Sequence, residues 1–366
     1  MKTEEPLATF STRLMAWYRK HHRPLPWRKS RDPYAIWISE VMLQQTQVKT
    51  VLPYYDHFLT TLPTVKDLAE SDMETVLKLW EGLGYYGRAR NLHRAAGMVM
   101  EHHQGKVPDD WKTFKTLPGV GDYIASAVQS IAFDHPYAVV DGNVKRVLAR
   151  MHAMDQAVND PRFHREFKHK ADQLLDTSAA AIFNQAFMEL GALVCTPRNP
   201  GCTSAPCPVC TSCQAFCQGS TDRYPVKKQK KTVPLYHIAA GVVRKEGRLL
   251  ITRRKSQGLL GGLWEFPGGK VKPRETAAAA CVREIAEETG LVVSAGSFLT
   301  RVKHAYSHFR IEMDVFLCDW GSGTVDLNGP VDFRWISPLE IDDYPFPGAN
   351  LKFIPLLQQA LLADSH

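Results

Sequence analysis

The sequence predicts a multidomain protein in which an all-α domain is followed by an α/β domain. From Leu7 to about Gln185, apolar residues recur at three- and four-residue spacing, as in residues 124–131, which is the pattern of amphipathic helices. After residue 234, short apolar runs separated by turn residues indicate strands. We therefore expect domains at 1–220 and 234–366, joined by a linker at 221–233.

Composition limits the class of protein. A chain of 366 residues with 44% hydrophobic residues is long and apolar enough for two globular cores. It contains no uninterrupted apolar run of about 18 residues, as a membrane span requires. The first 17 residues lack the apolar centre of a secretory signal. We expect a soluble cytoplasmic protein.

The protein has a net charge of +7, and its basic residues are most concentrated in the linker at 221–233. The basic residues of this linker, opposed only by Asp222, are Arg223, Lys227, Lys228, Lys230 and Lys231. A basic connector between two domains is typical of proteins that hold a nucleic-acid backbone. On charge alone, an ordinary solvated linker explains it equally well.

The α/β domain is expected to contain strands near residues 237–243, 249–252, 312–318 and 333–336. A helix is predicted from Thr276 to Thr289, because Gly290 stands where a helix commonly stops.

Two segments of the helical domain indicate chemistry. Leu117-Pro-Gly-Val-Gly precedes a helix, so Gly119 and Gly121 would let backbone N–H groups approach a phosphate. Alone, this pattern is weak, since many turns share it. About 20 residues later, Asp141 lies in an otherwise apolar run, where a carboxylate needs a partner or a task.

Six ordered motifs carry a resemblance to a known family. They are Leu25-Pro-Trp-Arg, Trp37-Ile-Ser-Glu-Val-Met-Leu-Gln-Gln-Thr, Trp80-Glu-Gly-Leu-Gly-Tyr-Tyr, Leu117-Pro-Gly-Val-Gly, Val140-Asp-Gly-Asn-Val and Glu189-Leu-Gly-Ala-Leu-Val-Cys. Together they resemble the helix-hairpin-helix superfamily of DNA glycosylases, and within it the adenine DNA glycosylase (MutY) family. The resemblance implies removal of adenine mispaired with 8-oxoguanine or guanine in duplex DNA, by a monomer.

The resemblance assigns the chemistry to two carboxyl groups. Glu40 would protonate adenine, and Asp141 would face the sugar cation, as paired carboxyls do in glycoside hydrolysis. Tyr123 and Asn143 would orient Asp141 and the water. Glycosylases of this superfamily that also cut the strand carry a lysine at the position of Tyr123. Without that amine no Schiff base forms, so we expect little or no lyase activity.

The resemblance also implies contacts with DNA. Trp27, Arg28 and Leu43 would surround an adenine turned out of the helix, while Gln45 and Tyr85 would lie near the 8-oxoguanine. Family members often carry glutamate at the position of Gln185. A neutral amide can still bind the adenine edge, so we expect altered binding there and unchanged chemistry.

Six of the eight cysteines lie between Cys195 and Cys217, which favours a metal or cluster site over disulfides. By resemblance, Cys195, Cys202, Cys207 and Cys213 would hold a 4Fe–4S cluster, although two extra residues separate the second and third cysteines. A rival set with ferredoxin-like spacing is Cys207, Cys210, Cys213 and Cys217. Four-thiolate zinc is a further alternative. Cys281 and Cys318, outside this segment, are expected to be buried thiols.

The C-terminal domain contains a complete Nudix signature, from Gly269 through Glu275 and Arg283 to Leu291. Glu284, Glu287 and Glu288 would share one helix face, where Mg²⁺ could bind. The resemblance instead makes this domain a reader of 8-oxoguanine, with Ser307 and His308 as its contacts. A Mg²⁺-dependent hydrolase of oxidised nucleoside triphosphates is the alternative for this domain. For the whole chain, the alternatives are a pyrimidine-directed glycosylase and a catalytically silent DNA-binding protein.

Overall fold

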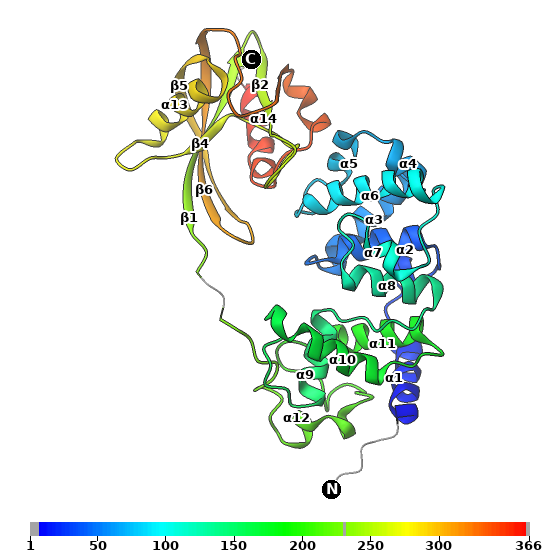
Figure 1. Ribbon diagram of the computed structural model, residues 1–366. Coiled ribbons are helices and arrows are strands. Elements are labelled where there is room, and N and C mark those ends of the chain that lie inside the picture. Colours follow the sequence, from blue (N-terminus) through cyan, green and yellow to red (C-terminus); the bar gives the residue numbers. More distant parts are fainter. Residues whose placement is uncertain (1–6, 230–231, 364–366) are drawn as a thin grey trace. The chain divides into compact units, whose positions relative to one another are not determined.

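The computed structural model describes residues 7–229 and 232–363, which form two compact units (Figure 1). The first unit comprises residues 1–66 and 95–230, and the second comprises residues 67–94 and 231–366. Lys230 and Lys231 of the predicted basic linker lie outside the described residues.

The first unit is built from helices, and no strand precedes Leu235 in the described part of the chain. Its elements are α1 (Leu7–His21), η1 (Pro26–Arg28), α2 (Pro33–Leu43), α3 (Val48–Thr61), α7 (Trp111–Lys115), α8 (Asp122–Phe133), α9 (Gly142–Met151), η2 (Pro161–Phe163), α10 (His164–Leu174), α11 (Ala180–Leu193), η3 (Cys210–Ser212) and α12 (Gln214–Cys217). The helices α4 (Val65–Glu70) and α6 (Gly87–His103) cross the boundary between the units.

Helix α2 shows how the sequence directs this unit. Asp32 caps its first turn by accepting hydrogen bonds from two backbone N–H groups, and Pro33 occupies the first helical position, where a missing N–H costs nothing. Residues 34–42 are all buried, as expected for a helix that is apolar on every side. The helix packs against α8 and α3. Glu40, the carboxylate side chain within residues 34–42, is therefore buried in the interior of the first unit.

A second apolar core in this unit is formed by α1, α9, α10 and α11. Phe10, Phe183 and Phe187 meet edge to face at its centre, an arrangement that aromatic rings prefer. This core fixes α9 and α11 side by side, so the residues that begin α9 are carried on a rigid support.

The second unit is dominated by a mixed sheet with the strand order β3-β2-β1-β6-β5, in which β1 and β6 run parallel. Strand β4 pairs with β1, and β7 pairs with β2. The elements are α5 (Met73–Leu79), β1 (Leu235–Lys245), β2 (Arg248–Arg253), β3 (Trp264–Glu265), β4 (Gly268–Lys270), α13 (Ala277–Thr289), β5 (Val292–Ala305), β6 (Arg310–Ser322), β7 (Asp332–Ile336), η4 (Pro338–Asp343), η5 (Asn350–Lys352) and α14 (Ile354–Ala363).

Helices cover both faces of this sheet. Alternate residues of β6 point to opposite sides: Met313, Val315 and Leu317 join the core beneath α14, whereas Phe316 and Cys318 join the core beneath α13. This alternation follows from the pleat of a strand. The result is a three-layered α/β structure.

Most predicted elements of this unit are present. Helix α13 begins after the cap Thr276 and ends at Gly290, which is left-handed with φ +69°. Strands β1, β2, β6 and β7 contain the four predicted segments. The sequence analysis did not identify β5, because shifts in its pairing with β6 between residues 292 and 300 interrupt the alternation that marks a strand.

Residues 67–94 contact the C-terminal part of the chain within the second unit. The Glu81 carboxylate accepts a hydrogen bond from the Phe346 N–H at 2.6 Å, and the Tyr86 hydroxyl donates to the Phe346 carbonyl at 3.2 Å. The Arg90 guanidinium donates to the carbonyl oxygens of Gly258 and Gly261. Polar bonds to backbone atoms thus hold these helices on the α/β fold.

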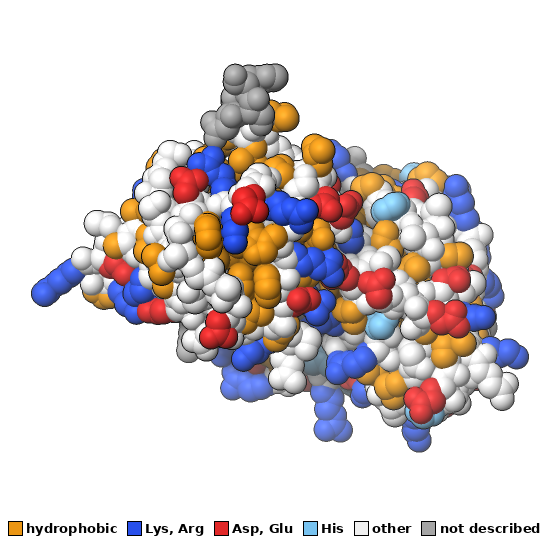
Figure 2. Space-filling view, turned by 90° about the horizontal axis from the view of Figure 1, so that it is seen from above, with side chains coloured by type: hydrophobic (Ala, Val, Ile, Leu, Met, Phe, Trp, Pro, Cys, Tyr) orange, Lys and Arg blue, Asp and Glu red, His pale blue; other side chains and the backbone are white. Residues whose placement is uncertain are grey.

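On the face shown in Figure 2, lysine and arginine side chains are mixed with acidic ones, so this face is neither uniformly basic nor uniformly acidic. Among the described residues, no helix combines the length and the apolar character needed to cross a bilayer.

Candidate active site

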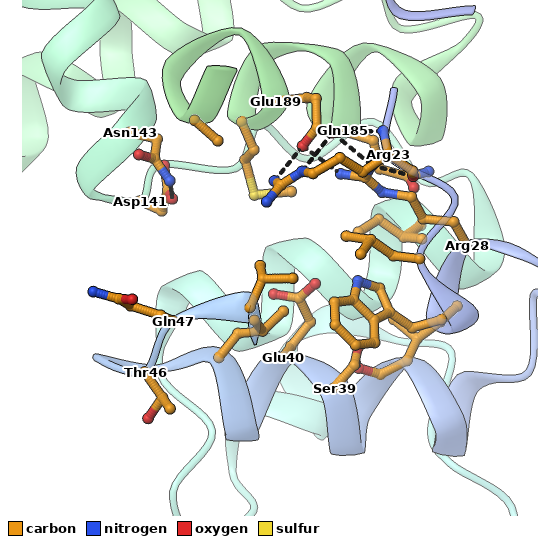
Figure 3. Close-up of a pocket in the computed structure, with 18 of the residues that line it drawn as sticks. Arg23, Arg28, Ser39, Glu40, Thr46, Gln47, Asp141, Asn143, Gln185 and Glu189 are labelled. Carbon is orange, nitrogen blue, oxygen red and sulfur yellow. Dashed lines mark hydrogen bonds and ion pairs between the residues drawn. The ribbon is translucent and has the colours of Figure 1, made fainter. Parts of the chain in front are cut away.

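A cavity of about 450 Å³ opens in the first unit. Its walls come from η1 and α2 on one side and from α8, the start of α9, and α11 on the others (Figure 3). The predicted site residues that line it are Trp27, Arg28, Glu40, Leu43, Tyr123, Asp141, Asn143 and Gln185. The fold therefore brings together eight residues that are spread over more than 150 positions of the chain.

Glu40 is the buried acid of this cavity, and its side chain is only 4% exposed. The Tyr123 hydroxyl donates a short hydrogen bond to one of its carboxylate oxygens. Burial raises the pKa of Glu40 to about 7, the negative charge of Asp141 adds to the rise, and the Tyr123 hydrogen bond and Arg28 oppose it. At neutral pH a large share of Glu40 therefore carries a proton, as a general acid must.

Asp141 lies across the cavity from Glu40 and caps α9 (Figure 3). Its carboxylate accepts hydrogen bonds from the Val144 N–H at 2.7 Å and from the Asn143 side-chain amide at 2.8 Å. Burial raises the pKa of Asp141, while these two hydrogen bonds and the charge of Arg146 oppose the rise. Each of these partners is a donor or a cation and favours the ionised form, against the burial that raises the pKa of Asp141.

Tyr123 is hydrogen-bonded to Glu40, and its hydroxyl also feels the charge of Asp141. Burial, together with the charges of Glu40 and Asp141, raises the pKa of its hydroxyl well above the usual value. The phenol therefore keeps its proton and acts as a donor. Tyr123 thus fixes the orientation of Glu40.

A chain of hydrogen bonds runs from Asp141 to the cysteine-rich segment. Asn143 donates to Asp141 and accepts from the Arg146 guanidinium at 2.7 Å. Arg146 also donates to the backbone carbonyls of Gly191 at 2.8 Å and Cys195 at 2.7 Å. The position of the carboxylate is therefore tied to α11 and to the first cysteine of that segment.

The wall of the cavity opposite Glu40 contains a charged group that the sequence analysis did not single out. Glu189 on α11 is 1% exposed and accepts hydrogen bonds from Arg23 and from Arg28. Burial alone would raise the pKa of Glu189, but the bonds from both arginines hold it at about 2. Its signal in the sequence was a glutamate within the otherwise apolar segment of α11, where a carboxylate needs a partner.

The other predicted DNA contacts lie outside the cavity. Gln45, in the turn after α2, is exposed and has φ +57°, and Tyr85 in the second unit has φ +50°. The Tyr85 hydroxyl accepts a 2.5 Å hydrogen bond from the Ser307 hydroxyl. His308 is exposed beside Ser307. Such left-handed backbone is uncommon for residues other than glycine and often marks functional positions.

The hairpin glycines form the turn between α7 and α8. Gly119 has φ +79°, which a glycine adopts without strain, and Gly121 precedes the first turn of α8. Helix α8 thus begins directly after these glycines, and their contact with a phosphate stays a prediction.

A second, small cavity is lined by Cys195, Cys202, Cys207, Cys210 and Cys213, whereas Cys217 is exposed and its thiol lies against the Thr211 carbonyl. Burial raises the pKa of Cys207 to about 12 and that of Cys213 to about 11. Arg150 donates to the Cys195 sulfur at 3.2 Å. Thiols gathered around one space, with a buried cation beside them, fit an anionic thiolate-bound group.

Within residues 7–229 and 232–363, no three His, Cys, Asp or Glu side chains converge on a point that could hold a single ion. Tetrahedral zinc requires four sulfurs at about 2.3 Å from one centre. For the cysteine cavity, the 4Fe–4S cluster and the zinc site both stay predictions.

The carboxylates of the Nudix signature are engaged by protein groups. Arg283 pairs with Glu275, Glu284 and Glu287, and Lys272 lies 3.5 Å from Glu287. Glu288 accepts from the Gly268 N–H at 3.1 Å, and burial, with the charge of Glu265 next, raises its pKa to about 7. This helix face is thus largely neutralised by the protein itself.

Comparison with known proteins places these features in a family. The model of the HhH-GPD superfamily of base excision DNA repair proteins matches residues 38–173, and the NUDIX domain model matches residues 239–356. The rat adenine DNA glycosylase is 36% identical over 85% of this chain and 70% of its own length. The chain belongs to the adenine DNA glycosylase family.

Further relatives agree with this assignment to the adenine DNA glycosylase family. The human adenine DNA glycosylase is 35% identical over 91% of this chain and 71% of its own length, and that of Buchnera aphidicola from Acyrthosiphon pisum is 31% identical over 84% and 86%. A thermostable thymine-DNA glycosylase structure superposes with a TM-score of 0.53 at 29% identity, covering 58% of this chain and 97% of that one. An endonuclease III–DNA complex, with TM-score 0.51 and 23% identity over 60% and 99%, shares the fold. The protein is a DNA glycosylase.

The packing of α11 against α9 yields a prediction. A Cβ added at Gly191 would lie 2.6 Å from the Asn143 Cβ and 3.1 Å from its backbone. Gly191→Ala should therefore displace Asn143 from Asp141, lowering stability by about 1–3 kcal/mol and slowing base release by roughly tenfold or more. Gly97→Ala, in a helix with open space around it, is the control. Wild-type single-turnover rates for Gly191→Ala would contradict the assigned role of this contact.

Proposed function

We propose that this protein removes adenine mispaired with 8-oxoguanine or guanine from duplex DNA by hydrolysing the bond between the base and its deoxyribose, the first step of base excision repair. The observation that supports it most is the pairing, in one cavity, of a protonatable buried acid with a carboxylate whose partners favour its charge. Hydrolysis of a glycosidic bond requires two carboxyl groups in these two states.

In the proposed mechanism, the adenine leaves the helix stack and enters the cavity, because its reacting atoms cannot be reached in the duplex. Glu40, oriented by Tyr123, donates its proton to a ring nitrogen and turns adenine into a better leaving group. Asp141, oriented by Asn143 and the Val144 N–H, stabilises the positive charge that develops on the sugar. A water molecule then completes the hydrolysis.

We propose that strand cleavage is not part of this activity. Tyr123 stands where lyases of the superfamily carry their lysine nucleophile, and its phenol cannot form an imine. Lys49 also lines the cavity, but its side chain is exposed. The abasic product is therefore expected to remain uncut.

The first prediction of this proposal concerns base release. A duplex with adenine opposite 8-oxoguanine should lose adenine, and its strand should break only after alkali. Glu40→Gln and Asp141→Asn should each slow release by at least 10²-fold, since each removes one of the two required groups. Duplexes with thymine opposite guanine test the pyrimidine alternative. Release from those duplexes alone, or unchanged rates in both variants, would refute the proposal.

The same assay has a predicted pH dependence. Because Glu40 must be protonated, the single-turnover rate should fall as the pH rises above about 7, the pKa of this carboxyl. The small residual activity of Glu40→Gln should not show this fall in rate with rising pH.

We further propose that the α/β domain reads the base opposite the adenine through Ser307 and His308. The hydroxyl contact between Ser307 and Tyr85 supports this role, because it joins two residues that the family resemblance places at the 8-oxoguanine. A Mg²⁺-dependent hydrolase stays the alternative for this domain, because Arg283 belongs to the Nudix signature itself and its ion pairs do not separate the two roles.

For the reader, Ser307→Ala should reduce the preference for 8-oxoguanine over guanine opposite adenine by roughly 10-fold, the value of one hydrogen bond to a ligand. The measurement is the ratio of the two single-turnover rates. Ser337→Ala, which removes a hydroxyl that caps η4, is the control. An unchanged ratio in Ser307→Ala would exclude this contact.

We propose that Cys195, Cys202, Cys207 and Cys213 hold a 4Fe–4S cluster, which would stiffen the segment and leave hydrolysis to the carboxyl groups. Cys207→Ser and Cys213→Ser should lower the iron and sulfide content of the purified protein, whereas Cys210→Ser and Cys217→Ser should retain both. Loss of iron in Cys210→Ser and Cys217→Ser, with retention in Cys195→Ser and Cys202→Ser, would reverse the assignment in favour of the rival set. Zinc without sulfide in the wild type would exclude the cluster.

A further inference from the structure

We infer that Glu189 is a positioning residue of the base-binding cavity: it holds Arg28 in the cavity wall and balances the charge of Arg23 and Arg28. This inference rests on the proposed function, because it assigns the wall opposite Glu40 to recognition of the extruded base. No part of the hydrolysis is assigned to Glu189 itself.

Both carboxylate oxygens of Glu189 accept hydrogen bonds from Arg23 and from Arg28. Arg23 donates to it from its backbone N–H at 2.9 Å and from its guanidinium at 2.9 and 2.6 Å. Arg28 donates from both terminal nitrogens, at 2.9 and 2.8 Å. Such two-pronged bonds to a carboxylate fix the plane of a guanidinium as well as its position. The segment before η1 is thereby fastened to α11.

The fastened Arg28 still has donors to offer. It also donates to the Arg23 carbonyl at 2.9 Å, so three of its five N–H groups are used within the described chain. Two N–H groups remain for a base in the cavity, whose ring nitrogens are acceptors. Because Glu189 sets the guanidinium plane, it also sets the direction of these two donors.

The contacts of Glu189 also connect to Gln185, which lies one turn before Glu189 on α11. The Arg28 guanidinium lies over the Tyr18 ring at 5.4 Å, and the Tyr18 hydroxyl donates to the Gln185 side-chain oxygen at 3.1 Å. The Gln185 side-chain nitrogen donates one N–H to the Ala181 carbonyl at 3.2 Å, which leaves its second N–H for a ligand in the cavity that Gln185 lines. Both groups on this wall are therefore donors, which suits the acceptor nitrogens of a purine edge.

The charge on Glu189 has a second effect, on Glu40. The titratable or charged residues that line the cavity are Arg23, Arg28, Glu40, Lys49, Tyr123, Asp141 and Glu189. The positive charge of Arg28 lowers the pKa of Glu40, against burial and Asp141, which raise it. Without the negative charge of Glu189, two uncompensated arginines would lower this pKa further, and Glu40 would lose its proton at a lower pH.

Glu189 could instead serve only to fasten η1 to α11, with no effect on recognition or on Glu40. Three variants separate these roles. Glu189→Gln removes the charge, Glu189→Asp keeps the charge but shortens the reach to Arg28, and the double variant Glu189→Gln with Arg23→Gln restores the net charge of the cluster. Asp172→Asn, in an exposed ion pair with Lys168 on α10, is the control.

Two measurements are made on each full-length variant after thermal unfolding has shown that it folds. The first compares two affinities: that for a duplex with an uncleavable 2′-fluoro-2′-deoxyadenosine opposite 8-oxoguanine, and that for a duplex with an abasic analogue at the same position. Their quotient is called the affinity ratio. The second is the pH dependence of single-turnover base release.

We expect Glu189→Gln and Glu189→Asp to lower the affinity ratio by roughly 10- to 100-fold, the range for a lost hydrogen bond to a charged group. Glu189→Gln should also move the fall in rate to lower pH, Glu189→Asp should leave it in place, and the double variant should return it toward the wild-type position. A folded Glu189→Gln protein with the wild-type ratio and pH profile would overturn the inference. If the wild type distinguishes the two duplexes but releases no adenine, the proposed function fails, while the affinity ratio still decides the role of Glu189.

Discussion

The organisation of the first unit depends on one constraint: a carboxyl group is placed where water cannot hydrate its charge. Residues 34–42 of α2 are all buried, so Glu40 can ionise only against the cost of its surroundings. The folded protein binds this proton up to about pH 7, whereas an unfolded glutamate releases it near pH 4.3. Between these values the unfolded state loses its proton first, so stability falls as the pH rises, by roughly 4 kcal/mol in all.

The two carboxyl groups of the cavity differ because their neighbours differ. Glu40 arises from the middle of a buried helix and has a neutral phenol as its partner, whereas Asp141 stands at the N-terminus of a helix, where N–H groups and a positive helix dipole favour an anion. The same helix end that orders Asp141 is anchored by Arg146 to α11 and to Cys195. Packing therefore gives Glu40 and Asp141 different surroundings, a difference that their residue types alone would not provide.

Much of this arrangement could be predicted from the sequence, because some positions leave few physical choices. Thr276 and Gly290 bound α13, and Asp141 in an apolar run required the partners that it has. What could not be predicted depends on tertiary contacts. The bond between Tyr123 and Glu40 joins residues 83 positions apart, and the clamp on Arg23 and Arg28 comes from Glu189, 161 positions beyond Arg28. Spacing along the chain carries no information about such contacts. Strand β5 was missed for a local reason, its irregular pairing.

Arg150 has a consequence for how the protein matures in the cell. Its guanidinium is 2% exposed and bonds to the Cys195 sulfur and to the carbonyl oxygens of Thr196, Thr221 and Tyr224, and among the described residues no carboxylate pairs with it. A full positive charge is thus enclosed by dipoles and one sulfur, a costly arrangement until an anion settles nearby. On the proposed 4Fe–4S assignment, a chain that lacks the cluster would leave this cation uncompensated, so the segment from Thr196 to Tyr224 would be less stable until the cluster is inserted.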